Sequence, residues 1–373
     1  MVLDEAQLLP PEFLNPILSV LKELVAHYKV TLLLSTATQP ALGEHRTPSF
    51  DFDGLPNASE IVEDPARLHE KLKRVDVVVP QSLTEPRSWE DLSGELQGHE
   101  SVLCIVNRRD DARTLCEIMP EGTFHLSALM CGAHRSAKIA EIKERLKGGL
   151  PTRVVSTQLV EAGVDLDFPV VYRALAGLDS IAQAAGRCNR EGLLNRGTVA
   201  IFVPPSKTPA GVLRQAEGLG RQLLSERAPD PLAPERFERF FREFYWMQGD
   251  RLDKHRVLEE LCDTECRFAF RTASQKVRLI DESAYSPVMV LYGEGANLAR
   301  LLESQGPERW ILRRLQRYVV NLPRRAHWKL VEAGAIREVH PALFVQGHGA
   351  LYDDRMGFCP DRSIVYEPDD LMF

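Results

Sequence analysis

The sequence lacks the long apolar run that a membrane-spanning helix requires, and it carries no secretory signal pattern. It lacks a disulfide framework as well, because its 7 cysteines are odd in number and irregularly spaced. An excess of positive charge is also missing: the formal net charge is −7, so any nucleic-acid site must be local. These absences argue against a membrane protein and a disulfide-stabilised secreted domain, and they favour the cytoplasm.

Two motifs of common binding sites are absent too. No Gly-Lys pair occurs, so the chain contains no phosphate loop of the form G-x-x-x-x-G-K-[ST]. Cys262 and Cys266 are closely spaced, but no second pair or histidine cluster completes a zinc set. With 373 residues, 44% hydrophobic and 27% charged, the chain is expected to form two or three globular domains.

The first part of the chain alternates strand and helix patterns. A short apolar start leads into Asp4 and Glu5, and residues 11–28 repeat apolar side chains at helical spacing. Residues 30–34 form a continuous apolar run, which is typical of a strand buried on both faces of a parallel sheet. The order predicts a βαβ unit whose strand ends carry polar residues, where such sheets bind ligands.

A second α/β segment follows a loop-rich stretch at 43–65. Its predicted strands are 102–106, 123–126, 152–157, 170–172 and 198–202, with helices at 110–119 and 136–146. A further strand is expected at 75–79 and a helix at 89–96. His134 and Arg135 are expected just before a helix, where they could meet a DNA phosphate; an ordinary solvated helix start explains them equally well.

Another group of polar residues lies at 183–190. Gln183, Arg187 and Arg190 are spaced by four and three residues, so a helix would place all three on one face. A polar face with two permanent cations suits a polyphosphate. An ordinary solvated helix face accounts for the same spacing equally well.

These segments resemble the motifs of superfamily 2 helicases, and they occur in that family's order. Residues 1–7 resemble motif II, with the sequence Asp-Glu-Ala-Gln, and residues 36–38 resemble motif III. Residues 157–167 look like motif V, and residues 183–190 look like motif VI. More narrowly, 156–165 and 185–190 are similar to the CRISPR-associated helicase–nuclease that degrades DNA in type I interference.

The resemblance covers about the first 205 residues and implies a set of roles. ATP and Mg²⁺ would be the cofactors, single-stranded DNA the substrate, and a crRNA-guided surveillance complex a partner. Asp4 would hold Mg²⁺ and Glu5 would be the catalytic base. The other implied roles are γ-phosphate contact by Gln183, Arg187 and Arg190, nucleotide binding by Gly163 and Asp165, DNA contact by Thr157, His134 and Arg135, and coupling by Thr36 and Thr38.

The same resemblance implies an N-terminal part with a phosphate loop and a nuclease domain, yet the sequence has neither a Gly-Lys nor a His-Asp pair. The expected fold is therefore α/β, with a partial first RecA-like lobe, a complete second lobe and a mixed α+β accessory domain. The expected boundaries are 1–42 for the first lobe, 43–95 for the inter-lobe linker, 96–205 for the second lobe, 206–285 for a helical connector and 286–373 for the accessory domain.

Three functional interpretations remain open at this point. The chain is the helicase portion of a CRISPR interference enzyme, active with its missing half; it is another superfamily 2 helicase acting on DNA or RNA; or it is a non-catalytic fragment that binds DNA or a partner. Dense aromatic residues at 237–246 are expected to form a helical core rather than a base-stacking surface. Basic residues between Arg309 and Lys329 form one local cationic patch, which suits DNA or a solvated face equally.

Overall fold

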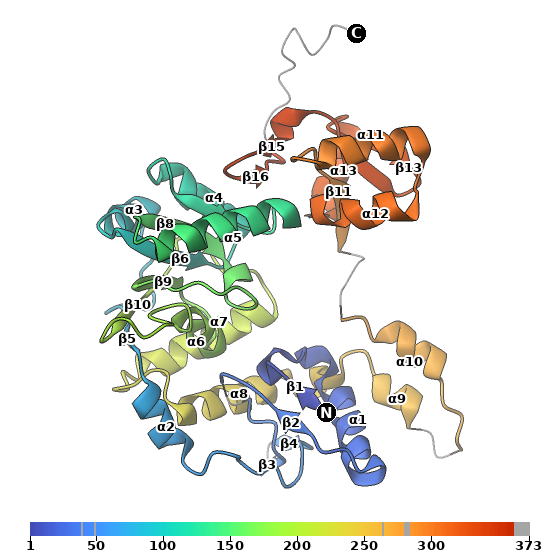
Figure 1. Ribbon diagram of the computed structural model, residues 1–373. Helices are drawn as coiled ribbons and strands as arrows, with labels where there is room; N and C mark the ends of the chain where they lie inside the picture. Colours follow the sequence, from blue (N-terminus) through green and yellow to red (C-terminus); the bar gives the residue numbers. More distant parts are fainter. Residues whose placement is uncertain (39, 48–49, 263–264, 280–283, 362–373) are drawn as a thin grey trace, which may run out of the picture. The chain divides into compact units, whose positions relative to one another are not determined.

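The computed structural model describes residues 1–38, 40–47, 50–262, 265–279 and 284–361 (Figure 1). These residues fall into two compact units. One contains the chain up to Glu85, then Leu175–Val203, and the residues from Lys207 through helix α10. The other contains Pro86–Ala174, Pro204–Ser206 and the described residues from 284 onward. Within the described residues, every helix is too short or too polar to cross a bilayer.

The N-terminal residues form the predicted βαβ unit. Strands β1 (Val2–Leu3) and β2 (Leu33–Leu34) pair in parallel, and helix α1 (Leu14–Tyr28) connects them. The expectation that residues 30–34 would be buried on both faces is wrong, because Leu33 is 38% exposed and Val2 is 63% exposed. The physical reason is that β1 and β2 form a sheet of only two strands among the described residues, so little covers their side chains.

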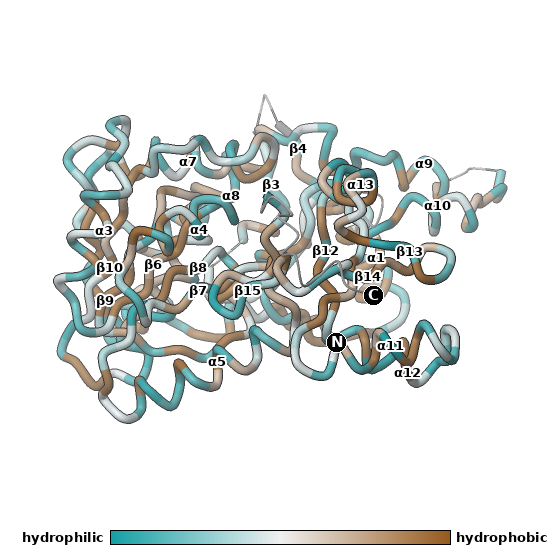
Figure 2. The backbone as a smooth tube through the Cα atoms, turned by 90° about the horizontal axis from the view of Figure 1, so that it is seen from above, coloured by the Kyte–Doolittle hydropathy of each residue, from teal (hydrophilic) through white to brown (hydrophobic). Residues whose placement is uncertain are grey.

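A six-stranded parallel sheet of the RecA-like type forms the centre of the fold, in the order β5-β10-β9-β6-β8-β7. Its strands are β5 (Val75–Val78), β6 (Ser101–Val106), β7 (Phe124–Leu126), β8 (Thr152–Thr157), β9 (Val170–Ala174) and β10 (Gly197–Phe202). Its helices are α2 (Pro65–Leu72), α3 (Trp89–Gln97), α4 (Arg109–Ile118), α5 (Gly132–Lys147) and α6 (Leu178–Ala185). Strand β6 is hydrophobic along its length, as its brown colour in Figure 2 shows, and its residues from Val102 to Val106 are buried.

Helices dominate the region after β10. They are α7 (Val212–Ser225), α8 (Pro234–Gln248), α9 (Val257–Leu261) and α10 (Phe270–Lys276). Earlier in the chain, the 43–65 stretch contains an antiparallel pair of strands, β3 (His45–Thr47) and β4 (Phe50–Phe52). The aromatic residues of α8 form a core, as predicted, because five of them are buried; only Trp246 is exposed. Within the expected helical connector, a 3-10 turn ends at Asp253, and α9 covers only Val257–Leu261.

The C-terminal part is a mixed α+β layer, as expected. Its sheet has the order β12-β11-β14-β13, with β11 (Tyr285–Met289), β12 (Val319–Pro323), β13 (Ile336–His340) and β14 (Leu343–Gln346). The helices are α11 (Gly295–Gln305), α12 (Arg309–Leu315) and α13 (Arg324–Glu332), and a small hairpin follows, β15 (Tyr352–Asp353) with β16 (Gly357–Phe358). The last residues of the expected accessory domain, 362–373, lie outside the described residues.

The cationic patch predicted between Arg309 and Lys329 is divided by this sheet. Val288 of β11 packs in one core cluster together with Leu330 of α13. Its neighbour Met289 packs in another cluster together with Ile311 of α12. Successive strand residues point to opposite faces of a sheet, so α12 and α13 cover opposite faces. The expectation of a single patch is therefore wrong.

Candidate nucleotide and nucleic-acid site

A chain of side-chain contacts joins the motif II residues to motif III. The Gln7 amide donates a hydrogen bond to the Glu5 carboxylate, and the Gln7 amide oxygen accepts one from the Thr36 hydroxyl. The Thr36 oxygen also lies 2.6 Å from the Thr38 carbonyl oxygen and accepts the Thr38 backbone N–H at 3.1 Å. Gln7 and Thr38 are buried. These contacts connect the Glu5 carboxylate to residues 36–38, and Gln7, which makes the connection, is a residue that the sequence analysis did not single out.

The backbone turns at Glu5, directly after Asp4. The backbone of Glu5 is left-handed, with φ 51°, and its N–H donates to the Asp4 carboxylate at 3.1 Å. Such a conformation costs a non-glycine residue on the order of 1 kcal/mol, so it persists only where other contacts hold it. One such contact is the hydrogen bond from the Ala6 N–H to the Ser35 carbonyl at 3.1 Å. Both carboxylates remain exposed and accessible to a ligand.

The motif V residues follow strand β8 directly. Thr157 ends the strand and is buried, and a 3-10 turn (Gln158–Val160) comes next. Gly163 has φ +70°, which a residue with a side chain rarely adopts, and a side chain there would meet open space. Asp165 is exposed. The turn therefore leaves both its backbone at Gly163 and a carboxylate open to solvent.

A buried arginine that the sequence analysis overlooked supports this turn. Arg173 of β9 has no exposed surface, and its Nε lies 2.8 Å from a carboxylate oxygen of Glu161, which directly follows the 3-10 turn. Its guanidinium also donates to the Asn107 side-chain oxygen at 2.7 Å and to the Ala174 carbonyl at 2.9 Å. Asn107 follows β6, so Arg173 links three neighbouring segments at the carboxyl ends of the strands. A charged residue inside an apolar strand was the available signal.

The motif VI residues do not share one helix face, contrary to the prediction. Helix α6 ends at Ala185 and is capped at Gly186, so Gln183 is helical whereas Arg187 and Arg190 lie in the turns that follow. Arg187 is buried and Arg190 is exposed. The physical reason is that glycine commonly ends a helix, which the spacing argument ignored. The Gln183 side-chain nitrogen is buried and finds no hydrogen-bond partner among the residues that the structure describes, so it could donate to an oxygen of a ligand.

Asn189 holds the turn that carries Arg190, and this role was not anticipated. Its left-handed backbone, φ 47°, suits asparagine better than most residues. Its side-chain amide donates to the carbonyls of Arg74 at 3.0 Å and Leu194 at 2.8 Å, and its oxygen accepts the Leu194 N–H at 2.9 Å. Arg74 in turn donates to the Arg190 carbonyl. The turn is therefore held mainly through backbone carbonyl and N–H groups, and the Arg190 guanidinium adds a hydrogen bond to the Gly186 carbonyl at 3.5 Å.

The structure places His134 and Arg135 within the first turn of α5, not before the helix as expected. His134 is buried, with Nδ1 3.0 Å from the Tyr352 hydroxyl and Nε2 3.1 Å from the Asp354 carbonyl. Because both ring nitrogens have protein partners, the DNA contact predicted for His134 is contradicted. Burial lowers its pKa, which keeps the ring neutral between these partners. Arg135 is half-buried and stays a predicted phosphate contact.

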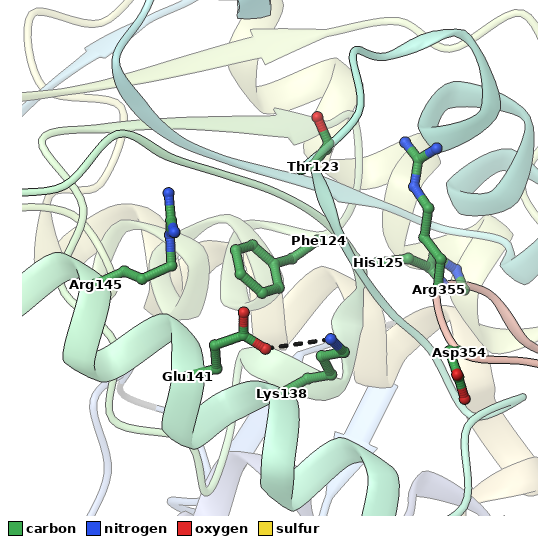
Figure 3. A pocket seen from close by; sticks show the side chains of 9 residues that line it. Thr123, Phe124, His125, Lys138, Glu141, Arg145, Asp354 and Arg355 are labelled. Carbon is green, nitrogen blue, oxygen red and sulfur yellow. Dashed lines mark hydrogen bonds and ion pairs between the residues drawn. The ribbon is translucent and has the colours of Figure 1, made fainter.

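A cavity of about 290 Å³ lies between β7, α5 and the turn of the β15–β16 hairpin (Figure 3). The ring of Phe124 lies between Lys138 and Arg145, with cation-to-centroid distances of 5.7 and 5.9 Å. His125 lines the same cavity, is buried, and has no hydrogen bond of normal geometry at either ring nitrogen. Burial lowers the pKa of His125 to about 4, although the Met356 backbone acts in the opposite direction.

This histidine is expected to make the fold sensitive to acid. In the unfolded chain the ring takes a proton near pH 6.5, whereas in the folded chain it does so only near pH 4. The unfolded state thus binds more protons in this window, and the free energy of unfolding falls as the pH drops from 6.5 to 4.5, by about 2–3 kcal/mol. Urea unfolding of His125→Asn should lack this part of the pH dependence, while His27→Gln, an exposed histidine, should keep it. Equal slopes in wild type and His125→Asn would contradict the assignment.

A RecA-like parallel sheet with polar residues after its strands, and a separate βαβ unit with an Asp-Glu pair, place the chain in the α/β class of proteins. Within that class, residues 99–193 match the family model described as the C-terminal part of the CRISPR-associated nuclease/helicase Cas3. The chain thus resembles the C-terminal helicase portion of that family, which confirms the resemblance seen in the motifs.

Individual relatives agree with the family model. The chain is 42% identical over 90 residues to the CRISPR-associated nuclease/helicase Cas3 of Haloferax volcanii, covering 22% of the chain and 10% of that protein. It is 27% identical over 205 residues to the protein of the same name from Methanothermobacter thermautotrophicus, covering 51% of the chain and 24% of that protein. Among solved structures, T. fusca Cas3-ATP matches with a TM-score of 0.63 and 16% identity, over 95% of this chain and 53% of that one. This likeness supports the fold, and the chain spans at most a quarter of these curated relatives.

Proposed function

We propose that the chain is the ATP-dependent, single-stranded-DNA translocating portion of a CRISPR interference helicase–nuclease. The observation that carries this proposal is the contact chain from Glu5 through Gln7 to Thr36 and Thr38, which links the implied catalytic carboxylate to motif III. Such a link is what a motor needs to couple the state of its nucleotide to its grip on DNA. The family resemblance and the solved relatives in complex with ADP and ATP support nucleotide use.

In this mechanism each group acts through its position. Asp4 would hold Mg²⁺, for which one carboxylate together with phosphate oxygens is a suitable ligand set, and the ion would supply charge neutralisation at the phosphates. Glu5 orients and deprotonates the attacking water. Gln183 has a free buried amide for a phosphate oxygen, and Arg187 and Arg190 stabilise charge on the γ-phosphate.

A second group of residues would contact the ribose of the nucleotide and the DNA strand. Gly163, whose backbone faces open space, and Asp165, which is exposed, would contact the ribose of the nucleotide. Thr157 and Arg135 contact DNA phosphates, which makes the grip independent of base sequence. Thr36 and Thr38 transmit the nucleotide state, so that alternating grip moves the strand. A relative is found in a CRISPR RNA-guided surveillance complex, and we propose such a complex as the partner that supplies the substrate.

The proposal is tested by ATP hydrolysis in the presence of single-stranded DNA. The chain by itself is compared with the chain plus a separately expressed N-terminal half that carries a phosphate loop. Hydrolysis is expected in the mixture and is stimulated by DNA. The matched control is the same half with its phosphate-loop lysine replaced by alanine, which should abolish hydrolysis.

Other results separate the competing interpretations. DNA binding without hydrolysis in either sample would favour a non-catalytic binding role, an interpretation that the lack of a Gly-Lys pair supports for the chain alone. Hydrolysis stimulated by RNA and not by DNA would favour a different superfamily 2 helicase. If the mixture neither hydrolyses ATP nor binds nucleic acid, the result contradicts the proposal altogether.

A further inference from the structure

The side chain of Arg135, the predicted phosphate contact on α5, is not held by any partner of its own. It is half-buried and makes no hydrogen bond or ion pair with the residues that the structure describes. A long, unpaired arginine samples many rotamers, so the direction in which it reaches is set by the backbone that carries it. That backbone is the first turn of α5, where the Arg135 N–H donates to the Cys131 carbonyl at 3.0 Å.

Tyr352 of the β15–β16 hairpin holds this turn. Its hydroxyl oxygen accepts the backbone N–H of Cys131 at 3.0 Å and lies 3.0 Å from Nδ1 of His134. Cys131 is the N-cap residue of α5, and its side chain makes no capping hydrogen bond. The N–H groups at the start of a helix have no partner within the helix, so the tyrosine takes a role that a capping side chain has elsewhere.

Chemistry fixes the directions of these hydrogen bonds. The Asp354 carbonyl, 3.1 Å from Nε2 of His134, can only accept, so Nε2 carries the hydrogen. Burial lowers the pKa of His134 and keeps the ring neutral, so Nδ1 is an acceptor and the Tyr352 hydroxyl donates to it. Burial also raises the pKa of Tyr352, so the hydroxyl keeps its proton. From the Cys131 N–H to the Asp354 carbonyl, each donor therefore meets an acceptor.

The hairpin that carries Tyr352 is itself fixed to the second lobe. Phe358, which pairs in register with Tyr352, is fully buried and donates its N–H to the Leu129 carbonyl at 2.8 Å. In the turn of the hairpin, Arg355 donates to the Cys116 carbonyl of α4 at 2.7 Å. The tyrosine hydroxyl is therefore presented to α5 from a backbone with little freedom to move.

His134 and Arg135 leave the helix in different directions, because successive helical residues are rotated by about 100°. The imidazole is stacked on the Tyr292 ring, with 4.3 Å between the ring centres and 19° between the planes. Stacking and hydrogen bonding together hold the imidazole in one place. Fixing His134 fixes the rotation of the first turn about the helix axis, and so the direction in which Arg135 leaves it.

We infer that Tyr352 and His134 are positioning residues for the phosphate contact of Arg135. They hold the first turn of α5 in one orientation, so that less ordering is needed when the guanidinium meets a DNA phosphate. The inference rests on the proposed function. It adds a role for the C-terminal hairpin in DNA binding, and it gives His134 a part in that binding although the ring does not touch DNA.

The test measures binding of a fluorescein-labelled oligo(dT) to the full chain without nucleotide, by fluorescence anisotropy at several salt concentrations. Arg135→Gln should raise Kd about 5-fold and reduce the slope of log Kd against log salt by about 0.7, the value for one phosphate of a single strand. Tyr352→Phe keeps the ring and removes the hydroxyl, and it should raise Kd about 3-fold and reduce the slope by a smaller amount. The matched control is Tyr318→Phe, a partly buried tyrosine that packs against the core of the same layer, and it should change neither quantity.

Further variants distinguish positioning from a general loss of stability. In the Arg135→Gln background, Tyr352→Phe should have no further effect on Kd, because the contact that it serves is already gone. His134→Asn keeps an oxygen that can accept from the tyrosine hydroxyl, so it should retain most of the wild-type slope. His134→Leu is similar in size but has no acceptor, and it should reduce the slope as Tyr352→Phe does.

Each other outcome overturns a distinct statement. Additive effects of Arg135→Gln and Tyr352→Phe, or equal losses for His134→Asn and His134→Leu, would overturn the positioning role and leave the proposed function intact. An unchanged slope in Arg135→Gln would overturn both the positioning role and the phosphate contact of this arginine, while binding by the wild-type chain would still support the proposed function. No binding of oligo(dT) by the wild-type chain would overturn the inference together with the DNA grip on which it rests.

Discussion

An Arg190→Ala variant is expected to lose at least about a thousandfold in kcat for DNA-stimulated ATP hydrolysis in the reconstituted mixture, because an arginine on the γ-phosphate contributes roughly 10³–10⁵ to phosphoryl transfer. The KM for ATP should change much less, since the contact strengthens as charge develops in the transition state. Arg190→Lys should recover little, because a lysine ammonium cannot reproduce the planar, bidentate geometry of the guanidinium.

The fold around Arg190 makes this variant informative. Asn189 fixes the turn through the carbonyl of Leu194 and through Arg74, and Arg74 binds the carbonyl of residue 190, which alanine retains. Because the guanidinium also donates to the Gly186 carbonyl at 3.5 Å, a loss of activity reports the missing phosphate contact when hydrogen exchange of this turn is the same as in the wild type. Arg196→Ala is the matched control, an exposed arginine that donates to the Lys73 carbonyl nearby. If Arg190→Ala hydrolyses ATP at the wild-type rate, the arginine has no role at the phosphate.

The strand patterns in the sequence predicted the central sheet well. The reason is that each pattern consists of the strand's own apolar side chains. A run such as 102–106 is apolar throughout, so all of its side chains are removed from water only in a parallel sheet that is covered on both faces. Strand β6 is indeed buried in such a sheet. The same argument failed at 30–34, where the run is apolar except for Thr31, but the sheet, of two strands among the described residues, leaves Leu33 exposed. Burial depends on what covers a strand, and the strand's own sequence does not contain that information.

Spacing predicted the members of the motif VI cluster but not their arrangement. Intervals of three and four place residues on one face only while the helix continues, and it ends before Arg187. Gly186 was the signal for that end. The contacts of Gln7 and Arg173 could not be predicted by any local rule, because each partner lies on another segment: Thr36 in the first case, Asn107 and Glu161 in the second. Only the folded topology brings these groups together.

Replacing Arg173 by methionine is expected to destabilise the second lobe by about 3–5 kcal/mol, the usual cost of removing one partner from a buried ion pair. Glu161 is buried and would lose its contact with the guanidinium at 2.8 Å, and Asn107 would lose one of its hydrogen-bond donors while keeping Gln158. The measurement is native-state hydrogen exchange of the β6 and β8 amides, which reports the free energy of opening this part of the sheet. Arg153→Met is the matched control: this partly buried arginine on β8 binds the backbone carbonyls of Gln97 and His99, and no ion pair is found for it among the described residues.

A double-mutant cycle separates the ion pair from the rest of this network. Glu161→Met alone would leave Arg173 charged and buried but still bound to Asn107 and the Ala174 carbonyl, so a smaller loss is expected than for Arg173→Met. The double variant removes both charges, and its loss should be at least about 2 kcal/mol smaller than the sum of the single losses. Additive losses would mean that the two side chains do not interact in the folded state. A coupled result, together with faster exchange in the 158–167 turn for Arg173→Met alone, would establish that the buried arginine holds motif V in place.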